Sequence, residues 1–179
     1  MTLALERLER RHRRLLGAFE NDSAELVAYL RRWALAHQER DHLSTTWLAV
    51  DHGAEGVRLA GYFSLAAATV ERSTIPDVGD LGKLPRFPVP AILLARLAVD
   101  SRVKGQGVGT WMFDELVQMS VAIAAEGPIG VRLIVTDAKD HRSFGFYAKR
   151  GMTSVVSDGW PRRMVIDLRP IVGSRKTLE

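Results

Sequence analysis

Residues 91–109, AILLARLAVDSRVKGQGVG, contain the most informative pattern in the sequence. Its first nine residues are apolar except for Arg96, which predicts a strand buried on both faces in the middle of a sheet. Three glycines at alternate positions follow the strand. Apolar residues then recur at steps of three and four through 107–125, which predicts an amphipathic helix. The stretch is therefore a buried strand, a glycine turn and a helix.

A glycine turn between a strand and a helix is suited to binding a phosphate. The first N–H groups of a helix have no partner within it, and its dipole is positive there, so backbone amides alone can hold an anion. The same glycines would also suit an ordinary tight turn. The dinucleotide-binding fingerprint is not met, because Thr110 stands where its last glycine belongs, and the Gly-Lys-Ser/Thr of a Walker loop is absent.

Further elements lie on both sides of this stretch. Upstream, residues 1–20 predict an irregular or partly helical lead-in, and a helix follows to about Arg40, with Asp22 and Glu25 as its capping box. The other predicted elements are strands at Thr45–Val50 and Val57–Val70, a long proline-containing loop at 71–90 that could face a substrate, a buried strand at Ile129–Thr136, a short helix at Lys139–Arg150 closed by Gly151, and a hairpin formed by 152–157 and 162–168.

Composition limits the classes of protein and of site. With 179 residues, 46% hydrophobic and 26% charged, the chain is expected to form one domain over 1–179, including a basic lead-in at about 1–20. It has no cysteine, which excludes disulfides, thiolate zinc sites and a cysteine nucleophile, and we expect no metal. It also has no apolar run of about 18 residues and no secretory signal pattern, so we expect no membrane association and a cytoplasmic location.

The net charge is +4, and part of the excess is local. Residues 7–14 contain five arginines and His12. Such a cluster can bind phosphates. A solvated helix face is the simpler interpretation, because Glu6 and Glu9 offset some of the charge.

The glycine turn resembles the acetyl-CoA motif of the GNAT superfamily of N-acetyltransferases. That motif reads Gln or Arg, two residues, Gly, one residue, Gly or Ala, and Lys104, Gly107 and Gly109 occupy those places here. The resemblance implies an α/β (α+β) fold with a mixed central sheet flanked by helices, and acetyl-CoA as co-substrate. It also implies that the pyrophosphate lies on the turn and that pantetheine pairs with the preceding strand. The residues so implied are Leu97, Ala98, Val99, Lys104, Gly105, Gln106, Gly107, Val108, Gly109 and Thr110.

A second landmark of the same family follows downstream. Phe146-Tyr147, three residues, then Gly151-Met152 resembles its aromatic-tyrosine pair followed by glycine and an apolar residue. The resemblance implies that Tyr147 is the general acid that protonates the leaving CoA thiolate. The alternative is a packing tyrosine. Neither His141 nor Glu71 stands out as a base, and an already neutral amine needs none, so the base stays unassigned.

Most of the chain is similar to the toxin acetyltransferases of bacterial toxin–antitoxin pairs. The similarity rests on residues 29–32, 61–67, 84–90 and 93–100, and it departs at 20–22, where such toxins often have Asp-Cys-Gly. It implies an aminoacyl-tRNA acceptor and a ribbon-helix-helix antitoxin, and a homodimer is compatible with it. The candidate tRNA contacts are Arg72, Lys83, Arg86 and Arg96.

Arg96 differs from the other three because its strand is otherwise apolar. A charge there needs a partner or a ligand, and a salt bridge within the sheet would satisfy it equally well. Two other functions remain open: acetylation of a small amine or of a protein N-terminus, and a non-catalytic fold that binds CoA or nucleic acid. A small ribbon-helix-helix repressor encoded directly upstream would favour the toxin.

Overall fold

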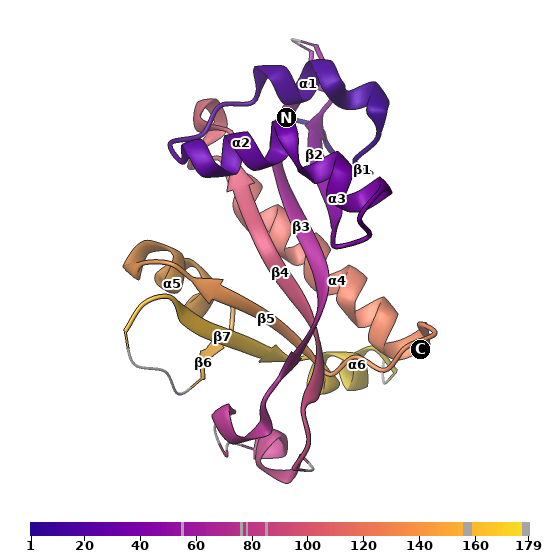
Figure 1. Ribbon diagram of the computed structural model, residues 1–179, viewed down its shortest axis with the longest axis vertical. Helices are drawn as coiled ribbons and strands as arrows, with labels where there is room; N and C mark the ends of the chain where they lie inside the picture. The colour runs from indigo at the N-terminus through magenta and orange to yellow at the C-terminus, as the bar shows by residue number, and fades with distance from the viewer. Residues whose placement is uncertain (55, 76, 78, 85, 156–158, 177–179) are drawn as a thin grey trace. The chain divides into compact units, whose positions relative to one another are not determined.

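The computed structural model of the protein describes residues 1–54, 56–75, 77, 79–84, 86–155 and 159–176. Its strands form one sheet in the order β1-β2-β3-β4-β5-β7-β6 (Figure 1). The pairs β1–β2, β2–β3, β5–β7 and β6–β7 are antiparallel and β4–β5 is parallel, which confirms the predicted mixed sheet. The strands are β1 (Leu3–Arg7), β2 (Thr45–Asp51), β3 (Arg58–Val70), β4 (Val89–Val99), β5 (Leu133–Ala138), β6 (Thr153–Ser154) and β7 (Arg162–Asp167).

Along the sequence, the helices alternate with these strands, and the last helix lies at the C-terminal end of the described chain. The α-helices are α1 (Arg13–Ala18), α2 (Ala24–Arg32), α3 (Ala34–Glu39), α4 (Val108–Glu126), α5 (His141–Ala148) and α6 (Arg169–Lys176). The short 3-10 turns are η1 (Arg10–His12), η2 (Arg72–Thr74), η3 (Gly79–Lys83) and η4 (Ser101–Val103). In the described part of the chain, no helix is both long and apolar enough to cross a membrane.

The chain forms two compact units. The first comprises residues 1–66 and 94–116, and the second residues 67–93 and 117–179. Each has its own apolar core, which is expected because burial of apolar surface is the main force that holds a compact unit together. The first core includes Phe19, Tyr29, Leu48 and Tyr62, and the second includes Val89, Ala91, Leu133, Val135 and Val165.

The predictions for the elements from β4 to α5, and for the hairpin after them, agree with the structure in type and order. The buried strand at Ala91–Val99 is β4, and the amphipathic helix at 107–125 is α4. The short helix is α5, and Gly151 follows it with φ +81°, which confirms the C-terminal glycine. The predicted hairpin is β6 with β7, although residues 156–158 lie outside the described chain.

Several details of the predicted elements differ from the structure. The lead-in is partly helical, as predicted, because it contains η1 and α1, but it also contains strand β1, whose residues Leu3–Arg7 all pair with β2. The predicted single helix is two helices, since Trp33 interrupts it, and its N-cap is Ser23 rather than Asp22. Strand β5 begins at Leu133, later than predicted, and α6 was not predicted at all.

Candidate active site

The glycine turn is held open by two left-handed backbone positions. Gly105 has φ +78° and Gly107 has φ +84°, a region that residues with a Cβ rarely adopt. Both glycines are exposed, and a Cβ built on either would meet no atom within 4 Å. The turn ends where Trp111 N donates to the Gly107 carbonyl at 3.0 Å, which starts α4. The backbone at Gly107 is therefore open to an approaching ligand.

Unpaired amides gather at the start of α4. Gln106 N donates to the Val103 carbonyl at 3.3 Å. By contrast, the N–H groups of Gly107, Val108 and Gly109 have no acceptor among the residues that the structure describes. The positive end of the helix dipole lies at the same place. This combination of free donors and partial positive charge is what a phosphate requires.

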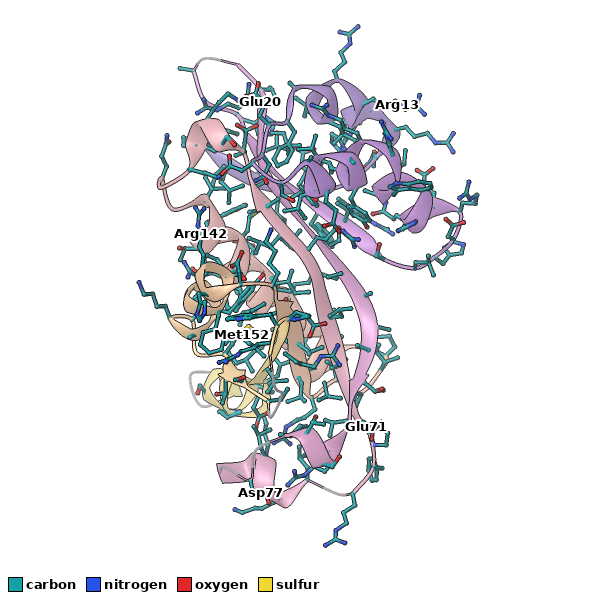
Figure 2. All side chains as sticks on the ribbon, turned by 60° about the vertical axis from the view of Figure 1, so that its left-hand side comes forward. Arg13, Glu20, Glu71, Asp77, Arg142 and Met152 are labelled. Carbon is teal, nitrogen blue, oxygen red and sulfur yellow. The ribbon has the colours of Figure 1, made fainter. Side chains whose placement is uncertain are left out.

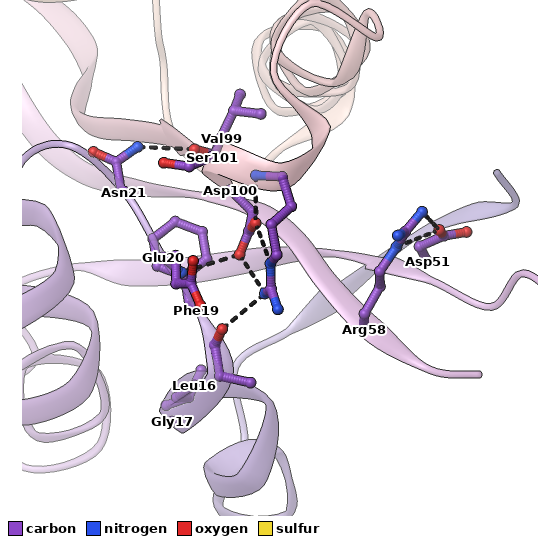
Figure 3. Close-up of polar contacts among 12 residues, drawn as sticks. Leu16, Gly17, Phe19, Glu20, Asn21, Asp51, Arg58, Val99, Asp100 and Ser101 are labelled. Atoms are coloured by element: carbon purple, nitrogen blue, oxygen red, sulfur yellow. Dashed lines mark hydrogen bonds and ion pairs between the residues drawn. The ribbon is translucent and has the colours of Figure 1, made fainter. Parts of the chain in front are cut away.

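The lead-in loop is attached to the start of the turn through Asp100 (Figure 3). Asp100 is buried, and its carboxylate accepts from the Arg102 guanidinium at 2.7 and 2.8 Å and from Glu20 N at 3.0 Å. Asn21 Nδ2 donates to the Val99 carbonyl at 2.8 Å. Burial alone would raise the pKa of Asp100, but the hydrogen bonds from Arg102 and Glu20 hold it below its ordinary value. These hydrogen bonds therefore fix the backbone at Val99 and Asp100, from which the glycine turn begins.

A second link involves the one lysine of the turn. Lys104 forms an ion pair with Asp22, and Ser101 Oγ donates to Asp22 Oδ1 at 3.2 Å. Asp22, predicted to cap a helix, instead neutralises the cation at the phosphate turn. A bound phosphate would compete with Asp22 for Lys104.

The C-terminal residues of strand β4 extend beyond the segment that pairs with β5. The parallel pairing covers Ala91–Leu93, and Leu97–Val99 continue the strand beyond it. In the first unit, a Cβ on Gly61 of β3 would lie 2.8 Å from the Ala98 carbonyl and 2.7 Å from Met112 Cε. Gly61 thus allows β3 to pack tightly against the end of β4. The Val99 carbonyl already has Asn21 as a donor, so Leu97 and Ala98 are the better candidates for pairing with a ligand.

Helix α5 carries Tyr147. Its N-cap, Asp140, accepts from Ser143 N at 2.8 Å, and the two side chains form a capping box. Tyr147 is buried and 8% exposed, and its hydroxyl is hydrogen-bonded to the Thr136 side chain on β5. Burial raises the pKa of Tyr147, against a smaller lowering by Thr136 and the Arg150 charge. The phenol therefore stays protonated at neutral pH, as a proton donor must.

Of the four predicted tRNA contacts, Arg96 is the one that lies in the first unit. Its guanidinium carbon lies 3.7 Å from the centroid of the Tyr29 ring, a cation–π contact within the first unit. No carboxylate pairs with it in the described chain, so the salt bridge within the sheet is not observed. Stacking fixes the plane of the guanidinium but leaves its N–H donors unused.

Arg72, Lys83 and Arg86 lie in the long loop of the second unit. The Arg72 side chain is 13% exposed and donates to the carbonyls of Ile75 and Gly82, each at 3.0 Å, and it forms an ion pair with Asp77. Its guanidinium therefore holds the loop together. Lys83 and Arg86 are exposed.

The sequence profile of the acetyltransferase (GNAT) family matches residues 4–152. The chain belongs to the GNAT acetyltransferase family. It is therefore an acetyl-CoA-dependent N-acetyltransferase, and the free amides of its glycine turn fit the diphosphate of that co-substrate.

Three comparisons describe its relatives. The acetyltransferase is 31% identical over 130 residues to a tRNA-acetylating toxin of Mycobacterium tuberculosis, covering 73% of each chain. Its fold matches AtaT complexed with acetyl-methionyl-tRNAfMet, with TM-score 0.82, 20% identity and coverage of 94% of this chain and 96% of that one. It also matches a tyrosine-to-phenylalanine mutant of the AtaT toxin bound to the C-terminus of the antitoxin AtaR and acetyl-CoA, with TM-score 0.75, 18% identity and coverage of 96% of both chains.

Sequence reasoning missed the anchor of the turn in this GNAT acetyltransferase. Asp100, Arg102 and Asn21 did not appear among the candidate residues. A signal was present, because an aspartate directly after a buried strand and two residues before an arginine is suited to cap a turn. Asn21, which donates to the Val99 carbonyl, lies 78 residues away from Val99 in the sequence, and no local pattern indicates that contact.

Proposed function

We propose that this acetyltransferase acetylates the α-amine of aminoacyl-tRNA and acts in the cytoplasm as the toxin of a toxin–antitoxin pair. The observation that carries the proposal is the 31% identity over 73% of the chain to a tRNA-acetylating toxin. The uncompensated guanidinium of Arg96 supports a polyanionic acceptor, since a small amine would not need a cation in the sheet.

The proposed chemistry uses few protein groups. The diphosphate of acetyl-CoA binds the free amides at Gly107–Gly109, while Leu97 and Ala98 offer backbone groups to pantetheine. The amine nitrogen attacks the thioester carbonyl, the carbon–sulfur bond breaks, and Tyr147 gives its proton to the leaving sulfur, while the proton that the nitrogen loses passes through water and restores the Tyr147 phenol. Because an α-amine titrates near pH ~8, enough of it is neutral without a protein base.

The partners follow from the same proposal. A ribbon-helix-helix antitoxin would neutralise the toxin, and its gene should lie directly upstream. Arg86 and Lys83 are the exposed loop cations that we assign to tRNA, together with Arg96. A homodimer stays a prediction that sedimentation would test.

A labelling experiment tests the acceptor. The enzyme is incubated with radiolabelled acetyl-CoA and with charged or uncharged tRNA. Label should appear only on charged tRNA, and mild base should release it as an N-acetyl amino acid. No label on a full set of charged tRNAs, with strong acetylation of a polyamine or a peptide, would show that the acceptor is a small amine or a protein N-terminus.

A further inference from the structure

An arginine-lined groove lies in the first unit, between the lead-in and the two helices that follow it. Its volume is about 890 Å³, and α1, α2 and α3 contribute to its walls together with η1. Half of the lining residues are arginines, against one carboxylate, that of Glu39. The arginines are Arg10, Arg13, Arg31, Arg32 and Arg40.

Three of the five arginines have partners that shape the groove. Arg31 donates to the carbonyls of Gly17 at 2.8 Å and Phe19 at 2.9 Å, which ties α2 to the end of α1. Arg10 pairs with Glu39 at 3.0 Å and Arg40 pairs with Asp41 at 2.7 Å. The last two pairs are on the surface, where such pairs contribute about 0.2–1 kcal/mol each, so a phosphate can replace the carboxylate.

The other two arginines are uncompensated. Arg13 and Arg32 are exposed, and neither side chain has a hydrogen bond or an ion pair with any residue that the structure describes. Figure 2 shows Arg13 on the outer side of the lead-in helices. Concentrating like charges along a groove is unfavourable unless an anion binds there, and a guanidinium fork matches the geometry of a phosphate.

A neighbouring hollow extends the arginine-lined groove within the first unit. Arg31 and Arg32 also line a second hollow of about 550 Å³, whose walls include Asp22 and Ser101 next to the glycine turn. The groove and this hollow thus share the two arginines at the C-terminal end of α2, while the other charged residues of the hollow are Glu20 and Asp22. A single phosphate would occupy a small part of the arginine-lined groove, whereas a phosphodiester chain could contact guanidinium groups along it.

We infer that the arginine-lined groove is a binding site for an RNA sugar–phosphate backbone, with Arg13 and Arg32 as its main phosphate contacts. The inference rests on the proposed function, because it assigns part of the tRNA to this groove. On this inference, Arg10 and Arg13 of the lead-in cluster belong to a binding site and are not simply a solvated helix face.

The test compares one double variant with a matched control. In Arg13→Glu with Arg32→Glu, KM for charged tRNA should rise at least ~10-fold at physiological salt while kcat is unchanged. The log–log salt slope of uncharged-tRNA affinity should become shallower by about 1.4–1.8, the value for two lost phosphate contacts. Acetylation of an aminoacylated trinucleotide, which is too short to reach a second site, should stay at the wild-type rate.

Lys139→Glu with Arg142→Glu makes the same change in net charge on an exposed part of the second unit. An equal rise in KM in this control would overturn the inference, because net charge would then explain the effect. So would an unchanged salt slope in the groove variant, or tighter groove binding by a polyglutamate peptide than by tRNA. Acetyl-CoA affinity and thermal unfolding check that both variants fold.

The two proposals fail differently. If the wild-type enzyme labels charged tRNA and the groove variant does so with unchanged KM, only the groove assignment fails. If the wild-type enzyme labels no charged tRNA, the proposed acceptor fails whatever the variant does.

Discussion

The glycine turn at residues 104–110, to which we assign the phosphate, and helix α5, to which we assign the proton donor, are built in opposite ways. The turn presents exposed backbone N–H groups, made accessible by the left-handed glycines Gly105 and Gly107. Helix α5 presents one buried side-chain oxygen, that of Tyr147. We therefore expect phosphate binding at the turn to be lost when a side chain is added, and proton donation from the helix to be lost when the Tyr147 oxygen is removed. Substitutions of both kinds can test this difference.

The largest expected effect is at the helix. Tyr147→Phe removes only the hydroxyl, so the fold and acetyl-CoA affinity should survive, while the rate of acetyl transfer should fall by ~10²–10⁴-fold. Single-turnover kinetics with preformed enzyme–acetyl-CoA complex measures the chemical step directly. A near-wild-type single-turnover rate would make Tyr147 a packing residue.

The pH dependence provides a control for the same assignment. The acid is active when protonated, and burial raises its pKa, so activity should be lost only above the ordinary tyrosine value near pH ~10. The wild-type kcat should thus stay level from pH 8 to about 10. Thr136→Val removes a hydrogen bond that lowers this pKa, so the level region should not shorten.

The next largest effect concerns the anchor of the turn. Asp100→Ala should lower the free energy of unfolding by about 2–4 kcal/mol, because it leaves Glu20 N and the Arg102 guanidinium without their acceptor. Since the pKa of Asp100 is held below its ordinary value, this stabilisation is present above pH ~4 and is lost as the pH falls. Urea unfolding of both proteins at pH 7 and pH 3 measures it. An equal difference at both values would contradict the account.

This anchor also marks the limit of what the sequence could predict. The turn itself was predictable, because glycine spacing and helical periodicity are local signals. The assignment of Tyr147 as the acid rests on its neighbours in the chain and stays a prediction. The edge strand β1, the Asn21–Val99 contact and the loop role of Arg72 depend on residues distant in sequence, and the chain carries no local sign of them. Arg96 could be singled out from the sequence as a side chain that needs a partner, because a charge in an apolar strand is unfavourable, and the structure gives it the Tyr29 ring.

The turn itself gives the third effect. Gly107→Val places a side chain where the phosphate must approach, and acetyl-CoA affinity should fall at least ~10-fold, the equivalent of losing one charge-assisted hydrogen bond. Calorimetry measures the affinity.

The control for Gly107→Val is Gly56→Val in the β2–β3 turn. That glycine has φ +104° and equally open surroundings, so the backbone strain is similar. Its acetyl-CoA affinity should match the wild type. A loss of affinity in both variants would mean that general strain, and not occupation of the phosphate site, is the cause.

The smallest expected effect is a gain, and it tests whether side chains modulate a site made of backbone. Asp22 holds Lys104 in an ion pair at the turn, and it places a negative charge near the phosphate site. Asp22→Asn keeps the shape of the side chain and removes that charge. Because exposed pairs contribute about 0.2–1 kcal/mol, acetyl-CoA affinity should rise by no more than about fivefold. Raising the salt concentration should reduce the gain, since exposed charges are screened. Asp41→Asn, which breaks the exposed pair with Arg40, is the matched control and should leave the affinity unchanged. An Asp22→Asn enzyme with wild-type affinity at low salt would show that Lys104 does not contact the phosphate, and that the amides of the turn hold it alone.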